Sequence, residues 1–152
     1  MVEASGDGAP REEVALQGVR ALLARGPFVE VDYQTVADEQ ALIRSRLRLM
    51  ADGDGLDLVL SCGGIGIGLR DRVPEATLEV VEREVPGLAE RIRLAAGDTN
   101  PELALTRGVA GVRRGVLIVN LPAGAKLMEA ALESVLELLP SAVAAARGSS
   151  GG

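Results

Sequence analysis

The chain has 152 residues, with 22 acidic and 16 basic side chains, one cysteine and no histidine, and its net charge is −6. That length suits one domain able to bury a core, and the acidic balance argues against nucleic acid and anionic membranes as partners. A single cysteine excludes an internal disulfide framework. No apolar run reaches the roughly 20 residues that cross a bilayer, and the first residues lack a secretory signal. We therefore expect a cytoplasmic protein.

Helical and strand patterns alternate along the chain. We expect flexible tails over 1–10 and 149–152, and a single domain over 11–148. Apolar spacing and helix-start signals predict helices over 12–25, 38–51, 74–84, 86–95, 100–107, 126–139 and 140–147. Apolar or alternating runs predict strands over 28–36, 56–60 and 115–120. This alternation favours an α/β fold of three layers, in which a mostly parallel sheet carries helices on both faces.

A glycine-rich loop follows the second predicted strand. Leu56–Leu60 has the short, branched, apolar composition of a buried parallel strand, and the sequence SCGGIGIGLRD comes directly after it. Ligands of open α/β sheets bind outside the carboxyl ends of the strands, where such a loop would lie. The glycines match neither a nucleoside-triphosphate loop nor a GxGxxG dinucleotide turn, so a purely structural turn fits these residues equally well.

Four blocks of sequence add a family resemblance. SCGGIGIGLRDRVPEAT resembles the molybdopterin-binding signature of the bacterial Mog and MoaB proteins and the gephyrin G domain, where TTGGTG precedes RD and TPEAT. ADEQ at 37–40, LTRGVAGVR at 105–113 and LIVNLP at 117–122 resemble further blocks of that family, in the same order. The resemblance implies a molybdopterin-binding fold, a homotrimer, and an enzyme of molybdenum-cofactor biosynthesis. In that family's reaction, AMP passes from Mg-ATP to molybdopterin.

The resemblance also implies site residues. Asp38 and Asp71 match the family's catalytic acids and would hold Mg²⁺, which prefers oxygen ligands. From the sequence alone, Asp38 could instead cap a helix and Asp71 could shape a loop. The substrate-binding candidates are Ser61, Cys62, Gly63, Gly64, Ile65, Gly66, Arg70, Arg107, Pro122, Gly124 and Lys126. Cys62 also suits simple packing, and the three basic residues suit solvated positions or helix ends.

Several departures from the family pattern keep other functions open. Cys62, Ile65 and Val73 stand where the family has hydroxyl-bearing residues, and LPAGAK at 121–126 replaces the usual LPGSPK. The family's first strand is expected to be truncated or missing here, which would leave a gap or an exposed edge in the sheet. The alternative functions are a non-catalytic pterin- or phosphate-binding module and an oligomeric scaffold on the same fold.

Overall fold

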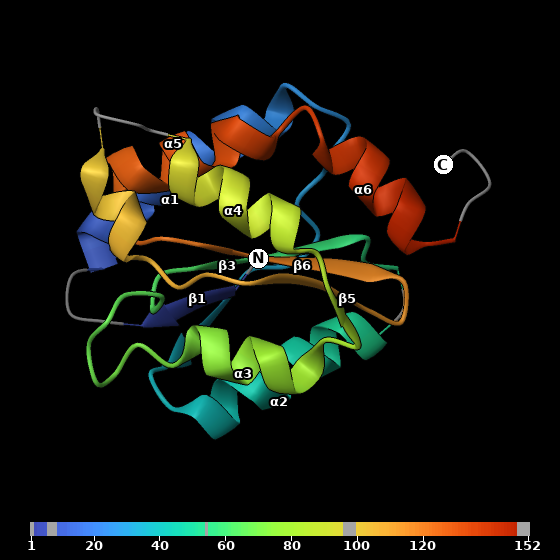
Figure 1. The fold of residues 1–152 in the computed structure, drawn as a ribbon, viewed down its shortest axis with the longest axis horizontal. Helices are drawn as coiled ribbons and strands as arrows, with labels where there is room; N and C mark the ends of the chain where they lie inside the picture. Colours follow the sequence, from blue (N-terminus) through green and yellow to red (C-terminus); the bar gives the residue numbers. More distant parts are fainter. Residues whose placement is uncertain (1, 6–8, 54, 96–99, 149–152) are drawn as a thin grey trace.

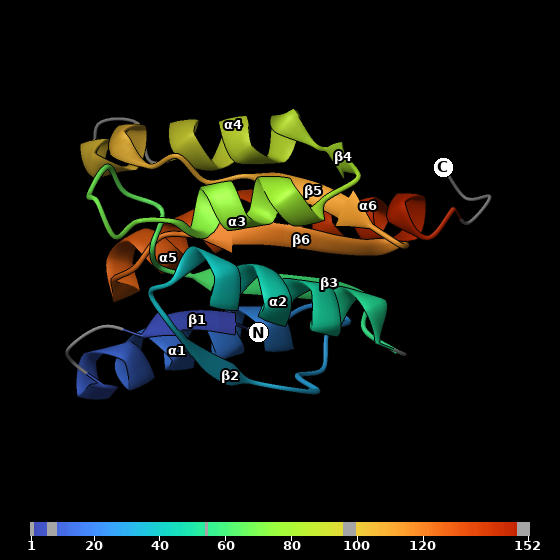
Figure 2. The same ribbon diagram turned by 90° about the horizontal axis from the view of Figure 1, so that it is seen from below.

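One six-stranded sheet forms the centre of the protein. The computed structural model describes residues 2–5, 9–53, 55–95 and 100–148. The strands are β1 Val2–Ser5, β2 Gln34–Ala37, β3 Leu58–Cys62, β4 Arg83–Glu84, β5 Ala110–Arg113 and β6 Val116–Leu121. Their order is β2-β1-β3-β6-β5-β4, as Figure 2 shows. β2, β1, β3 and β6 are parallel to one another, and β5 is antiparallel to both of its neighbours, β6 and β4. The prediction of a mostly parallel sheet is confirmed.

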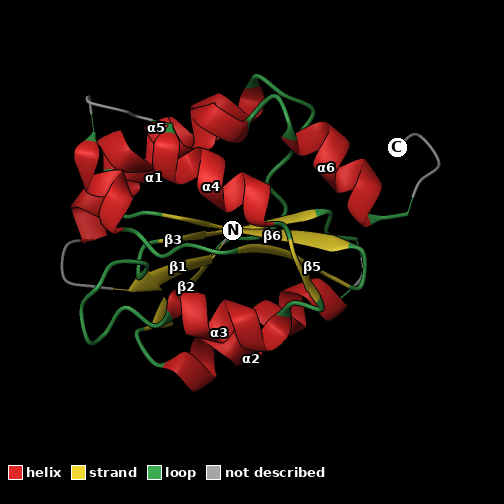
Figure 3. Ribbon diagram, in the orientation of Figure 1, coloured by secondary structure: helices red, strands yellow, loops and turns green. Residues whose placement is uncertain are grey.

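Helices cover both faces of this sheet (Figures 1 and 3). They are α1 Ala9–Ala24, α2 Gln40–Asp52, α3 Val73–Val80, α4 Pro86–Leu94, α5 Ala125–Val135 and α6 Leu139–Ala146, together with a 3₁₀ helix, η1, at Pro101–Leu105. α2 and α3 lie on one face, and α1, α4, α5 and α6 lie on the other. Among the described residues, no helix is long and apolar enough to cross a membrane.

Strand β6 contributes to two apolar cores, one on each face of the sheet. Leu117 and Val119 pack with α1, α4, α5 and α6, whereas Val116 and Ile118 pack with α2 and α3. Successive side chains of a strand point to opposite faces, so a strand covered on both sides must be apolar throughout. The unbroken apolar run that predicted this strand therefore reflects its central position.

The first strand is present but short, in agreement with the predicted truncation. β1 pairs along its whole length with β2, yet it meets β3 only through Val2 opposite Ser61 and Glu3 opposite Cys62. A cavity of about 260 Å³ lies beside the unmatched part of β3, lined by residues of 27–32 and 55–60 and by Leu23. The expected gap in the sheet is therefore internal, between β3 and the segment that precedes β2.

Several predicted boundaries were wrong. Residues 2–5 form β1 rather than part of a tail, while 6–8 and 149–152 lie outside the described residues. The strand expected over 28–36 is limited to β2 at Gln34–Ala37, all four residues of which pair with β1. The helix expected over 74–84 ends at Val80, and β4 follows it. β4 and its partner β5 were both missed, because strands of two and four residues carry little periodicity.

Candidate functional site

The loops that follow the parallel strands meet at one edge of the sheet. Asp38 comes directly after β2, residues 63–72 follow β3, and residues 122–124 follow β6. The chain passes from β1 to β2 on one side and then returns to β3 on the other side of β1. Such a topological switch point opens a crevice at the carboxyl ends of the strands, where ligands of this fold class bind. β1 separates β2 from β3, so their ends stand about 10 Å apart, two strand spacings.

Glycine is required where the chain turns out of β3. Gly63 and Gly64 have φ values of +91° and +72°, a backbone region that side chains with a Cβ rarely adopt. The Gly63 N–H donates to the Leu121 carbonyl at 2.8 Å, and a Cβ at Gly63 would lie 3.6 Å from that of Ala123. The loops after β3 and β6 therefore lie side by side. Gly64 is partly exposed and can present its backbone to a ligand, whereas Gly63 is buried with its N–H bonded to Leu121.

The carboxylate of Asp71 is part of the glycine loop. Its Oδ2 accepts the Gly68 N–H at 2.8 Å, and the Asp71 N–H donates to the Gly68 carbonyl at 3.1 Å. A Cβ at Gly66 or Gly68 would come within 2.9 or 2.8 Å of the same oxygen. The glycines thus leave room for the acid as well as for backbone turns, and Asp71 remains partly exposed at the edge.

Arg107 binds this loop from the segment that precedes β5. Its Nε donates to the Gly66 carbonyl at 2.8 Å, and its Nη2 donates to the Asp71 carbonyl at 2.6 Å. Both terminal nitrogens also donate to the carboxylate of Glu75 in α3, at 2.5 and 3.3 Å. The hydrogen bond from Arg107 lowers the pKa of Glu75, and the same bond raises the pKa of Arg107. Glu75 was not among the predicted site residues, although it belongs to the quoted PEA block.

Three predicted binding residues have buried side chains. Ser61, Cys62 and Ile65 are each 2% exposed or less. The Ser61 hydroxyl accepts a hydrogen bond at 2.8 Å from the amide of Asn120, a buried β6 residue. All three residues are thus buried as a whole, and Ser61 and Ile65 are already bonded within the protein, Ser61 through its hydroxyl and Ile65 through its carbonyl, which accepts the Arg107 N–H.

Asn120 organises the strand ends beneath the loop. Its amide nitrogen donates to Ser61 Oγ and to Thr77 Oγ1 at 2.8 and 3.0 Å, and its Oδ1 accepts the Val109 N–H at 2.9 Å. Buried polar groups need such partners. Sequence reasoning missed this residue, although a lone asparagine in the apolar run LIVNLP was a usable signal.

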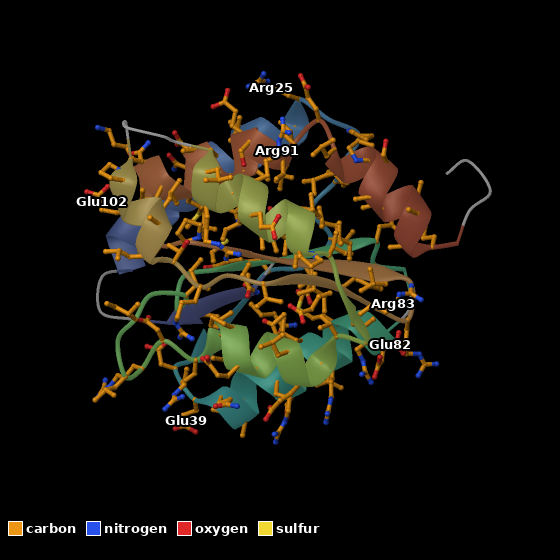
Figure 4. The ribbon with its side chains drawn as sticks, viewed as in Figure 1. Arg25, Glu39, Glu82, Arg83, Arg91 and Glu102 are labelled. Carbon is orange, nitrogen blue, oxygen red and sulfur yellow. The ribbon has the colours of Figure 1, made fainter. Side chains whose placement is uncertain are left out.

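The remaining predicted residues lie around the same edge. Arg70 and Lys126 are exposed, on the glycine loop and in the first turn of α5, while Pro122 is buried. Gly124 has a φ of +91° at the N-cap of α5. Figure 4 shows Glu102 of η1 at one end of the molecule and Glu82 and Arg83 at the other.

Asp38 precedes the helix that it was expected to cap. The N-cap residue of α2 is Glu39, which makes no side-chain capping bond, and Asp38 is the residue before it. Within the described residues, no three His, Cys, Asp or Glu side chains gather into a metal site. Mg²⁺ does not require such a cage, because it commonly binds one or two carboxylates together with substrate phosphates. Asp71, partly exposed at this edge, is one carboxylate of this kind.

The fold and this edge define a doubly wound α/β protein with a candidate ligand site at its topological switch point. Residues 10–141 match the family described as "Probable molybdopterin binding domain". The chain therefore belongs to the molybdopterin-binding domain family.

Relatives with curated names support this assignment. The chain is 39% identical over 129 residues to the molybdopterin adenylyltransferase of Helicobacter pylori (strain J99), an alignment covering 85% of this chain and 73% of that protein. It is also 39% identical over 109 residues to the molybdopterin adenylyltransferase of Escherichia coli K12, covering 72% of this chain and 55% of that protein. The alignment with the second relative thus spans only about half of its length.

Solved structures agree. The molybdopterin biosynthesis enzyme MoaB from Thermus thermophilus superposes with a TM-score of 0.89 at 46% identity, covering 97% of this chain and 94% of that one. The molybdopterin biosynthesis Mog protein from Mycobacterium ulcerans gives a TM-score of 0.82 at 29% identity, with coverage of 97% and 94%. The molybdopterin-binding fold is confirmed.

Proposed function

We propose that this protein is a molybdopterin adenylyltransferase, which transfers AMP from ATP to molybdopterin in molybdenum-cofactor biosynthesis. One observation carries the proposal. Asp71 is fixed at the carboxyl edge of the sheet, within a glycine-rich loop, in a chain 39% identical to relatives named for this activity. The divergent Cys62 and Ile65 do not count against it, because their side chains are buried away from that edge.

In the proposed reaction, an oxygen of the terminal phosphate of molybdopterin attacks the α-phosphorus of ATP. A new P–O bond forms, the bond to the pyrophosphate breaks, and adenylylated molybdopterin and pyrophosphate are the products. Transfers of this kind depend mainly on positioning and on stabilising negative charge on the phosphate oxygens.

Different residues at the carboxyl edge of the sheet would take different roles in this reaction. The backbone of Gly64 would approach a phosphate closely, and Arg70 and Lys126 would offset its charge despite the acidic net charge of the chain. Asp38 and Asp71 are the acids that would hold Mg²⁺. When bound, this ion would neutralise negative charge on the phosphates.

The decisive experiment incubates purified protein with molybdopterin, Mg²⁺ and ATP and measures adenylylated molybdopterin and pyrophosphate. Asp71→Asn and Asp38→Asn should abolish product formation while molybdopterin binding stays measurable. Binding without product in the unmodified protein would favour a binding module, and neither binding nor product would favour a scaffold. A homotrimer and a cytoplasmic location are further expectations, the first of which light scattering can test.

A further inference from the structure

The guanidinium of Arg107 is almost fully occupied by the protein itself. It makes four hydrogen bonds, to the carbonyls of Gly66 and Asp71 and to both carboxylate oxygens of Glu75. A guanidinium has five N–H donors in a fixed planar fork. A substrate phosphate would therefore have to compete with Glu75 or with loop carbonyls for this side chain. This arrangement suits a support better than an anion ligand.

The contacts of Arg107 reach both ends of the glycine loop. Its backbone N–H donates to the Ile65 carbonyl at 2.7 Å, where the loop leaves β3, and its side chain reaches the Asp71 carbonyl, where the loop enters α3. Between these two ends, the loop is closed by the Asp71 carboxylate on the Gly68 N–H. The position of the Asp71 carboxylate thus depends on the conformation of the loop backbone, and Arg107 holds that backbone at both ends.

We propose that Arg107, paired with Glu75, is a positioning residue that holds the Gly66–Asp71 loop so that the Asp71 carboxylate faces the substrates, and that it is not itself a substrate ligand. Its kinetic consequence rests on the proposed adenylyl transfer. The pairing also assigns a role to Glu75, whose carboxylate orients the fork of Arg107 toward the two loop carbonyls.

Arg113 offers a matched control at the other end of β5. Its Nε and Nη2 bind the carboxylate of Asp52 at 2.8 and 3.0 Å, and its Nη1 donates to the Val80 carbonyl, at the end of α3, at 3.0 Å. Both arginines therefore join a carboxylate to backbone, Arg107 through two carbonyls and Arg113 through one, but only Arg107 contacts the glycine loop. Arg107→Gln and Arg113→Gln remove closely similar interactions at the two ends of one strand.

The first test is steady-state adenylylation with both variants. Arg107→Gln should lower kcat by about 10- to 100-fold, the size expected from a misplacement of about 1 Å, and leave KM for ATP and molybdopterin within about twofold. Arg113→Gln should keep the kcat of the unmodified protein. A raised KM with unchanged kcat would make Arg107 a substrate ligand and overturn the proposal. An equal loss of kcat in both variants would also overturn it.

A second test does not depend on activity. Hydrogen exchange of the Gly68 amide, followed by NMR without substrates, should accelerate about tenfold in Arg107→Gln and stay unchanged in Arg113→Gln. An unchanged Gly68 rate in Arg107→Gln overturns the inference, even if adenylyl transfer is confirmed. If the unmodified protein forms no product, this measurement decides the positioning role separately from the proposed function. Should Arg107→Gln fail to fold, Arg107→Lys takes its place, because lysine keeps the charge but cannot span the three acceptors.

Discussion

Gly68→Ala perturbs the Asp71 carboxylate without removing it. A Cβ at Gly68 would stand 2.8 Å from Asp71 Oδ2, whereas ordinary van der Waals contact begins at 3.4 Å. The oxygen must therefore move by about 0.6 Å, and misplacements near 1 Å cost up to about 100-fold in rate. We expect kcat for adenylyl transfer to fall by about tenfold, equivalent to about 1.4 kcal/mol of activation free energy.

The same substitution should spare the fold. The atom that must yield is the end of a partly exposed side chain, and Gly68 does not require a positive φ. Urea denaturation should therefore give an unfolding free energy within about 1 kcal/mol of the unmodified protein.

Gly87→Ala is the matched control for Gly68→Ala. No atom lies within 4 Å of a Cβ at Gly87, in the first turn of α4, so alanine there should add about 0.5–1 kcal/mol of stability and leave kcat unchanged. A folded Gly68→Ala protein with unaltered kcat would refute the reasoning that the position of Asp71 limits the reaction.

Three further predictions concern stability. Arg114→Asn should raise the unfolding free energy by about 0.5–1 kcal/mol in urea titrations, because Arg114 has a φ of +49° in the two-residue β5–β6 turn, where asparagine is favoured; a loss would contradict this. Asn120→Ala should cost about 3 kcal/mol, because it removes the donor to the Ser61 and Thr77 hydroxyls and the acceptor of a backbone N–H, although Thr77 keeps its bond to the Val73 carbonyl; a cost below about 1 kcal/mol would contradict this. Arg107 lowers the pKa of Glu75 below its ordinary 4.5, so this pair stabilises the fold above about pH 4.5 and loses that contribution as the pH falls through the lowered value. Glu75→Gln should therefore lower the unfolding free energy at pH 7 and leave it equal to that of the unmodified protein at acidic pH. An equal loss of unfolding free energy at both pH values would show that charge is not responsible.

Strong local signals predicted much of the fold, and weak ones did not. The unbroken apolar run of β6 and the periodicity of α5 are local properties, so both elements were expected from the sequence. β4 forms by pairing with β5, and β5 also pairs with β6. The sequence of such a short segment does not reveal these pairings. β1 was mistaken for a tail for the same reason, because its partners are distant in sequence.

The candidate site was also predicted only in part from the sequence. The sequence predicted the loop, Asp71 and a function for Arg107, but it assigned that arginine to the substrate. Only the structure shows Arg107 bound to Glu75 and to the loop carbonyls, 32 to 41 residues away. Likewise, Ser61 was predicted to bind substrate, and its burial against Asn120 became apparent only in three dimensions.

The sequence by itself determined the family, the alternation of helices and strands, and the glycine loop with its acid. These features depend on the order and spacing of neighbouring residues, which the chain carries locally. The tertiary structure decided which side chains face the edge of the sheet, which are buried beneath it, and which hold the loop in place. Those outcomes depend on contacts between segments far apart in the chain, and only the packing of the whole sheet brings them together.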